Sequence, residues 1–184
     1  MCKPVNIRVA GFGGQGIMMF GQMLAYCATN DNMFSLWVPS YGPETRGGTA
    51  NCSVIVSTKM INSPVFTNAD VLVAFNQPSL EKFKEMIVPG GCILYNSSMI
   101  HDPILPEGVR GYGIPINDIA LELGTIQVSN MTMLGAYLEF SELFSDATAE
   151  KVLEKYLGEK KAHLLGINKQ AILRGREALR ALKG

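Results

Sequence analysis

The stretch NIRVAGFGGQGIMMFGQMLAYCAT, residues 6–29, combines a short apolar strand, a glycine-rich turn and an apolar helix. Ile7 and Val9 belong to the expected strand, and Ile17, Phe20 and Leu24 belong to the helix that follows the turn. Strand, glycine turn and helix in this order open a doubly wound sheet. We therefore expect an α/β fold that begins with a Rossmann-like unit.

The glycines of this turn also indicate a binding function. Gly11, Gly13 and Gly16 fit the G-x-G-x-x-G spacing, which lets a ligand approach bare backbone. The helix behind the turn presents free amides and a partial positive charge, so an anion is the expected ligand. The additional Gly14 and the polar Gln15 favour a binding loop, with a purely structural tight turn as the alternative.

The ligand of this turn does not look like NAD. A standard NAD site places an Asp or Glu at the end of the second strand, roughly 20 residues after the glycines. Here the expected second strand, residues 33–38, ends in Pro39, Ser40 and Tyr41, and Asp31 precedes it in a turn. The ribose-binding carboxylate is therefore missing from its expected place.

Composition sets the class of the protein. With 184 residues, 47% apolar and 17% charged, the chain is long enough for one well-buried domain, which we expect to span residues 1–184. Sixteen basic residues balance sixteen acidic ones, which argues against nucleic-acid binding. No stretch reaches the roughly 20 apolar residues of a membrane span or resembles a signal peptide, so we expect a cytoplasmic protein.

The four cysteines, Cys2, Cys27, Cys52 and Cys92, are scattered without a C-x-x-C pair. This spacing predicts neither a zinc site nor an iron–sulfur cluster, and we expect reduced thiols in or near the core. Any electron transfer would then use metal centres on another chain.

A second informative stretch, SYGPETRGGTANCSVIVS, covers residues 40–57. It holds several hydrogen-bonding groups between its glycines: Tyr41, Glu44, Thr45 and Arg46. Because this loop leaves the carboxyl end of the second strand, it should meet the glycine turn at the edge where α/β sheets bind ligands. Arg46 could contact a phosphate or carboxylate, and Glu44 could orient it. A solvated surface loop is the alternative.

Further strands complete the expected sheet. Residues 50–57 alternate between apolar and polar and should return through a turn into Met60 and Ile61 as an antiparallel hairpin, which makes the sheet mixed. Residues 71–75 form a continuous apolar run typical of a central parallel strand. Asn76 and Gln77 follow it, either to meet a ligand or to cap the next helix. We expect residues 89–91, Pro-Gly-Gly, to end that helix before a strand at 92–95.

The second half of the chain is expected to be mainly helical. The helix around Gly135 and Ala136 has small residues that allow close packing. The last helix should carry Arg174, Arg176 and Arg180 on a solvated face. The expected architecture is a three-layer α/β/α arrangement with a mixed, largely parallel sheet.

His101 and Asp102 stand side by side in a loop and could suggest a catalytic pair. Sequence neighbours on a loop rarely have the required geometry, and no serine or cysteine lies in a nucleophile motif. We therefore assign no catalytic residue and no metal ligand to this chain.

Four blocks give the sequence a specific resemblance: GFGGQGI at 11–17, PSYGPETRGGTANCSVIVS at 39–57, INSP at 61–64 and ADVLVAFNQPSLEKF at 69–83. Together and in this order, they resemble the gamma subunit of 2-oxoacid:ferredoxin (acceptor) oxidoreductases, with SYGPETRGG closer to the 2-oxoglutarate or branched-chain type than to the pyruvate type. Beyond about residue 91 the similarity lies mainly in length and element order.

The resemblance implies a supporting subunit that is inactive alone. Thiamine diphosphate, Mg and iron–sulfur clusters would lie on partner subunits, with no cofactor bound by this chain alone. The partners would be alpha and beta subunits, a ferredoxin-like delta subunit as a further candidate, and ferredoxin as the electron acceptor. A homo-oligomer stays an open alternative in isolation.

Coenzyme A would be the co-substrate at the glycine turn and the 41–46 loop, although this edge could equally serve as a subunit interface. Two other functions stay open: a nucleotide-dependent oxidoreductase acting alone and a ligand-free structural adaptor.

Overall fold

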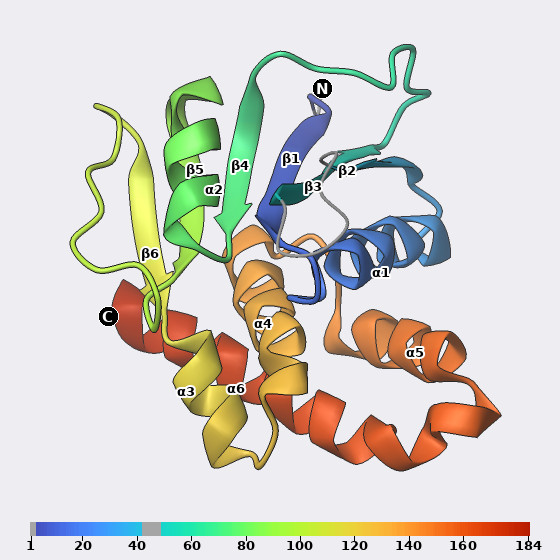
Figure 1. Ribbon diagram of the computed structural model, residues 1–184. Helices are drawn as coiled ribbons and strands as arrows, with labels where there is room; N and C mark the ends of the chain where they lie inside the picture. Colours follow the sequence, from blue (N-terminus) through green and yellow to red (C-terminus); the bar gives the residue numbers. More distant parts are fainter. Residues whose placement is uncertain (1–2, 42–48) are drawn as a thin grey trace.

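A six-stranded mixed sheet forms the centre of the protein, whose computed structural model describes residues 3–41 and 49–184 (Figure 1). The strand order is β2-β3-β1-β4-β5-β6. The bounds are β1 Val5–Phe12, β2 Phe34–Tyr41, β3 Thr49–Ser57, β4 Ala69–Ala74, β5 Ile87–Asn96 and β6 Arg110–Ile114. β3 is antiparallel to both β1 and β2, whereas β1, β4, β5 and β6 pair in parallel. The predicted mixed, largely parallel sheet is confirmed.

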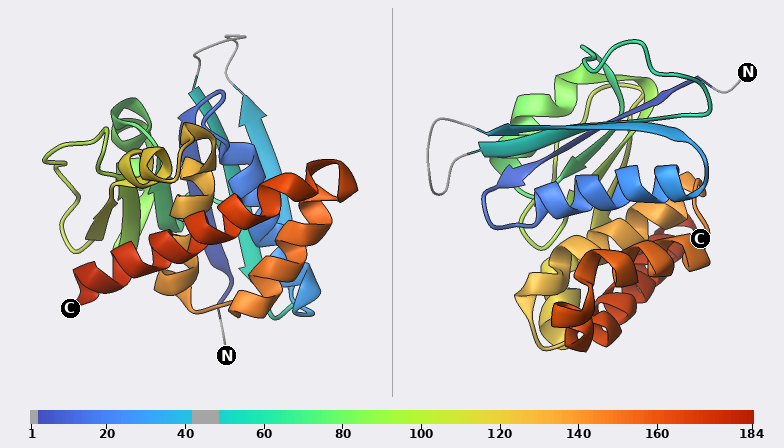
Figure 2. Two further views of the ribbon diagram at one scale, coloured as in Figure 1. Left: turned by 90° about the horizontal axis from the view of Figure 1, so that it is seen from below. Right: turned by 90° about the vertical axis from the view of Figure 1, so that its right-hand side faces the viewer.

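Helices cover both faces of this sheet. Figure 2 shows most of them on one face and α2 on the other, which gives the predicted three layers. The α-helices are α1 Ile17–Asn30, α2 Gln77–Phe83, α3 Ile116–Glu122, α4 Ser129–Ser141, α5 Asp146–Leu157 and α6 Leu165–Lys183. Short 3-10 turns are η1 Lys84–Met86, η2 Ile126–Val128 and η3 Glu159–Leu164. None of the helices in the described ranges combines the length and apolar composition needed to cross a membrane.

Two apolar clusters hold the layers together. The larger one lies between the sheet and α1, α4, α5 and α6, and the fully buried rings of Phe20, Phe75 and Tyr137 meet edge to face in it. The smaller cluster lies on the α2 side and includes Leu72, Leu80 and Ile93. The apolar strand β4 contributes to both clusters, as expected of a strand covered on both faces.

The predicted hairpin between residues 50–57 and 60–61 is wrong. Residues 60–61 are not in a strand, and β3 instead pairs with β2 from Phe34↔Ser57 to Tyr41↔Ala50 and with β1 on its other side. Pairing with β1 and β2 along its whole length gives β3 far more backbone hydrogen bonds than pairing with the two residues 60–61 could. The sheet is mixed, but through a different pairing.

The Pro-Gly-Gly segment does not end a helix as predicted. Helical structure stops with η1, and β5 already begins at Ile87, so Pro89, Gly90 and Gly91 lie inside the strand. The β4–β5 register shifts between Ala69 and Val71, next to this segment. Gly90 has φ 81° there, a backbone conformation that glycine adopts readily.

The small-residue face of α4 is confirmed as a packing surface. A Cβ on Gly135 would collide with the Ile172 carbonyl oxygen, and one on Gly175 would collide with the Thr132 carbonyl oxygen. The backbones of α4 and α6 therefore touch at these two glycines. At this contact α6 crosses over α4 (Figure 2).

Candidate functional site

The glycine turn and the end of β2 meet at one edge of the sheet, as the sequence predicted. In the ladders, Ala50 pairs with Gly11 on one side and with Tyr41 on the other. The Tyr41 side chain is exposed at this edge. Glu44, Thr45 and Arg46, the other predicted residues of the 41–46 loop, lie outside the described residues.

The glycines of the turn divide into two kinds. A Cβ on Gly11 would lie 2.7 Å from Gln15 Oε1 and 2.9 Å from Phe75 Cβ, and one on Gly16 would collide with the Asn130 side chain. Gly13 and Gly14 are exposed, and a Cβ on either would meet nothing within 4 Å. Packing explains Gly11 and Gly16, whereas Gly13 and Gly14 form the open backbone of the turn.

Gln15 fixes the shape of this turn from within. Its Oε1 accepts hydrogen bonds from the Phe12 backbone N–H at 2.7 Å and from Asn76 Nδ2 at 2.8 Å. Asn76 is almost fully buried, and its Oδ1 caps α2 by accepting from the Ser79 N–H at 3.0 Å. The capping role predicted as one alternative for Asn76 is confirmed, and the same side chain also connects α2 to the glycine turn.

Two helix amino termini converge beside the turn. Helix α1 begins after Gly16 without a side-chain cap, and α4 begins at Ser129. Asn130 Nδ2 donates to the Gly16 carbonyl oxygen at 3.3 Å and so joins the two ends. Both termini carry partial positive charge, which favours an anion between them.

A cavity of about 200 Å³ lies at this junction. Its lining comes from the turn, the start of α3, η2 and the start of α4, and consists of Gly14, Gln15, Gly16, Asn117, Ile126, Gln127 and Ser129. None of these residues is acidic or basic. The predicted site residues Gly14, Gln15 and Gly16 thus share a cavity with four residues from the second half of the chain, which the sequence reasoning missed.

A regular feature of the sequence could have indicated part of this cavity. Asn76 follows β4, Asn96 ends β5 and Asn117 follows β6, so an asparagine marks the carboxyl end of three neighbouring parallel strands. Carboxyl ends of parallel strands meet at the ligand-binding edge of a sheet. Gln127 and Ser129 have no comparable signal, because only the packing of α4 brings them to this edge.

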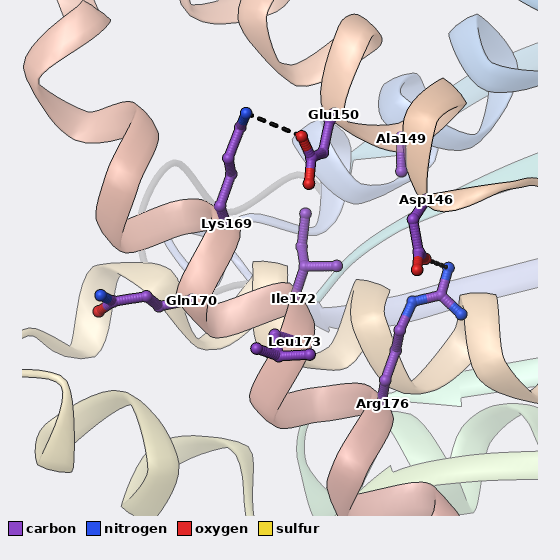
Figure 3. A pocket seen from close by; sticks show the side chains of 8 residues that line it. All are labelled: Asp146, Ala149, Glu150, Lys169, Gln170, Ile172, Leu173 and Arg176. Atoms are coloured by element: carbon purple, nitrogen blue, oxygen red, sulfur yellow. Dashed lines mark hydrogen bonds and ion pairs between the residues drawn. The ribbon is translucent and has the colours of Figure 1, made fainter.

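A second cavity, of about 230 Å³, lies between α5 and α6 (Figure 3). The charged side chains that line it are paired: Lys169 Nζ lies 2.8 Å from Glu150 Oε2, and Arg176 contacts Asp146. Arg176 is only 7% exposed, so its predicted place on a solvated face is wrong. It continues the buried stripe of Ile172 and Leu179 at helical spacing, and its charge is also met by Glu139.

The three cysteines in the described part of the chain lie in the core. Cys27, Cys52 and Cys92 are buried as predicted, and burial raises the pKa of each to about 12. Within residues 3–41 and 49–184, no cluster of three His, Cys, Asp or Glu side chains could hold a metal ion. His101 and Asp102 are exposed on the loop after β5.

The sequence matches the family model of pyruvate ferredoxin/flavodoxin oxidoreductase over residues 6–178. The ketoisovalerate oxidoreductase subunit VorA of Methanothermobacter marburgensis is 42% identical over 74% of this chain and 28% of its own length. The match to the family model includes the glycine turn described above.

Solved structures show the same fold. A 2-oxoglutarate:ferredoxin oxidoreductase from Magnetococcus marinus, with 2-oxoglutarate, coenzyme A and succinyl-CoA bound, superposes with a TM-score of 0.90 and 31% identity over 98% of this chain and 32% of its own. The gamma subunit of a keto/oxoacid ferredoxin oxidoreductase from Geobacter sulfurreducens gives a TM-score of 0.83 and 28% identity over 96% of this chain and 99% of its own. The chain thus spans about a third of the length of VorA (28%) and of the Magnetococcus marinus protein (32%). It spans nearly all of the Geobacter sulfurreducens gamma subunit.

Proposed function

The chain belongs to the pyruvate ferredoxin/flavodoxin oxidoreductase family, and from this premise we propose that it is the gamma subunit of a 2-oxoacid:ferredoxin oxidoreductase. The complex would decarboxylate a 2-oxoacid, join the acyl group to coenzyme A and pass two electrons to ferredoxin. The observation that carries this proposal is the structural correspondence with the gamma subunit from Geobacter sulfurreducens, which covers 96% of this chain and 99% of that one.

Within the complex, we assign to this chain the coenzyme A side of the active site. The support comes from the uncapped start of α1, the exposed backbone of Gly13 and Gly14, and the nearby Tyr41. Phosphates bind readily to such helix amino termini. The proposed contact residues are Gly11, Gly13, Gly14, Gln15, Gly16, Tyr41, Glu44, Thr45 and Arg46.

The proposed substrate is 2-oxoglutarate or a branched-chain 2-oxoacid. The similarity to a ketoisovalerate oxidoreductase subunit and to a 2-oxoglutarate:ferredoxin oxidoreductase supports these two classes. Alpha and beta subunits would supply thiamine diphosphate, Mg and the iron–sulfur clusters, and the assembly would work in the cytoplasm. In this proposal residues 1–184 act as one domain.

Anaerobic affinity purification from the native extract tests the assignment. A tagged chain should recover larger partner subunits, and the eluate should reduce a viologen dye only when a 2-oxoacid and coenzyme A are both present. Comparing 2-oxoglutarate, ketoisovalerate and pyruvate then identifies the substrate. Recovery of the chain alone and without activity, from an extract that itself contains the activity, would overturn the proposal.

A further inference from the structure

We propose that Asn117 is a ligand-binding residue, that Asn96 positions it, and that together they make the cavity at the glycine turn a site of hydrogen-bond donors for phosphate oxygens. This cavity is the one lined by Gly14, Gln15, Gly16, Asn117, Ile126, Gln127 and Ser129. The identity of the phosphate compound as coenzyme A rests on the proposed function. The donor character of the cavity rests on the hydrogen bonds alone.

The orientation of the Asn96 amide is fixed by two backbone groups. Asn96 is fully buried at the end of β5, and its Nδ2 donates to the Phe75 carbonyl oxygen at 3.3 Å. Its Oδ1 accepts from the Ser98 backbone N–H at 3.1 Å. A carbonyl can only accept and a backbone N–H can only donate, so the amide cannot be turned around without losing both bonds.

The orientation of the Asn96 amide in turn fixes the orientation of the Asn117 amide. Asn96 Nδ2 also donates to Asn117 Oδ1 at 3.2 Å. Because the Asn117 oxygen is engaged by a donor, its Nδ2 is the end that remains for the cavity. Asn117 Nδ2 has no hydrogen bond to any residue that the structure describes. Asn117 therefore offers N–H donors to a ligand.

Gln15, which lines the same cavity, also has its amide oxygen engaged within the protein. Its Oε1 accepts from Phe12 and Asn76, and the backbone N–H of Phe12 fixes this choice of atom. Among the residues that the structure describes, its Nε2 has only a weak sulfur acceptor, Met99, at 3.8 Å. Two side-chain amides thus present nitrogen rather than oxygen at this cavity.

Ser129 adds a further free polar group to the cavity. It lines the cavity at the first residue of α4 and is only 8% exposed, yet its hydroxyl has no hydrogen-bond partner among the described residues. The hydroxyl oxygen itself is not fully buried, so it can be reached from the cavity that the residue lines. A ligand oxygen in the cavity would satisfy this group.

Phosphate is the group that fits these donors. The lining contains no carboxylate, and the nearby Asp118 is held by Ser98, whose hydroxyl donates to it at 2.9 Å. Two helix amino termini add positive potential without any cationic side chain. The volume of about 200 Å³ is below the roughly 300–1,000 Å³ of pockets for whole drug-sized ligands, so the cavity takes only the phosphate-bearing part of a larger molecule.

Asn117→Asp tests the proposal, because it replaces the donor by a negatively charged acceptor of the same shape. In the assembled complex the Michaelis constant for coenzyme A should rise about tenfold or more, as expected when one hydrogen bond to a charged group is lost. Asn117→Ser keeps a small hydroxyl donor and should have a smaller effect. Asn68→Asp is the control, since exposed Asn68 precedes β4 at the opposite edge of the sheet.

Equal Michaelis constants for Asn117→Asp and Asn68→Asp in an active complex would overturn the proposal. A wild-type complex without coenzyme A-dependent activity would instead remove the proposed function and leave the cavity to be tested by itself. For that case, inorganic diphosphate is titrated into the full, ¹⁵N-labelled chain. Saturable NMR shifts of the Asn117 side-chain amide and of the Gly14 backbone amide, with the Gly14 shift weakened in Asn117→Asp, support the donor site, and unshifted signals refute it.

Discussion

Gln15 and Asn76, sixty-one residues apart, are joined by a 2.8 Å hydrogen bond from Asn76 Nδ2 to Gln15 Oε1. Because Asn76 also caps α2 through Ser79, this bond connects the glycine turn after β1 to the helix after β4. The turn is therefore shaped by a side-chain network of the protein itself before any ligand binds.

Removing the Gln15 side chain should destabilise the protein. Gln15→Ala leaves the nearly buried Asn76 amide and the Phe12 N–H without their acceptor, which should lower the free energy of unfolding by about 1–3 kcal/mol. Urea unfolding measures the change. Gln77→Ala is the matched control, because the hydrogen bond that Gln77 makes to Glu81 within the described residues is exposed and its loss should cost no more than about 0.5 kcal/mol. Equal losses for both variants would contradict a structural role for Gln15.

Two glycines of helical segments should respond in opposite directions to alanine. A methyl group on Gly135 would collide with the Ile172 carbonyl oxygen of α6, so Gly135→Ala should cost about 1–3 kcal/mol by forcing the helices apart. Gly166 in α6 faces open space, and Gly166→Ala should stabilise by up to about 1 kcal/mol. Thermal unfolding of both variants distinguishes them. A harmless Gly135→Ala would show that α4 and α6 are not in backbone contact.

The Glu139 carboxylate should make stability depend on acid pH. Arg180 Nε donates a hydrogen bond to Glu139 Oε1 at 2.8 Å, and Arg176 donates another to the same carboxylate. These hydrogen bonds hold the pKa of Glu139 below its ordinary value. A carboxyl with a lowered pKa in the folded state contributes stability above its unfolded pKa of about 4.3, and this contribution is lost as the pH falls through the folded pKa. Stability should therefore decline below about pH 5.

Glu139→Gln should remove this part of the acid dependence and flatten the curve of unfolding free energy between about pH 5 and pH 3. Glu122→Gln serves as the control, because Glu122 pairs with Arg174 at the surface and both side chains are largely exposed. If both variants retain the wild-type slope, the Glu139 cluster does not contribute to acid unfolding.

The buried thiols should be unreactive in the native state. Burial raises the pKa of Cys27, Cys52 and Cys92 to about 12, so almost no thiolate exists at pH 8. A disulfide reagent such as DTNB should leave Cys27, Cys52 and Cys92 unmodified in native protein and should modify all three in denaturant. Rapid modification of two or more native thiols would contradict the described packing.

The orientation of the Asn96 and Asn117 side-chain amides depends on hydrogen-bond partners that lie far apart in the sequence. Asn96 and Asn117 are 21 residues apart, and Asn96 is oriented by the carbonyl of Phe75, another 21 residues before it. Sequence spacing placed Asn76 at the end of a strand, yet no local pattern tells which atom of a side-chain amide faces a cavity. Only the backbone groups brought together by the folded sheet decide that.

The wrong predictions for residues 50–57 and for Arg176 came from relying on short-range sequence features alone. The alternation of residues 50–57 correctly indicated a strand, but its partners are β1 and β2 rather than the next residues of the chain. Arg176 looked solvated because arginines usually are, whereas Glu139 and Asp146 come from α4 and α5 to meet its charge. Pairing and burial both depend on elements distant in the sequence.

The sequence by itself determined the strand, glycine turn and helix at residues 6–29, the largely parallel sheet in three layers, and the resemblance to the family. These follow from short-range features: apolar periodicity, glycine spacing and the order of the blocks. The tertiary structure alone decided which strands flank β3, which charges are buried and which amide nitrogens face the cavity. Those outcomes require partners for backbone and charged groups, and folding supplies the partners from distant parts of the chain.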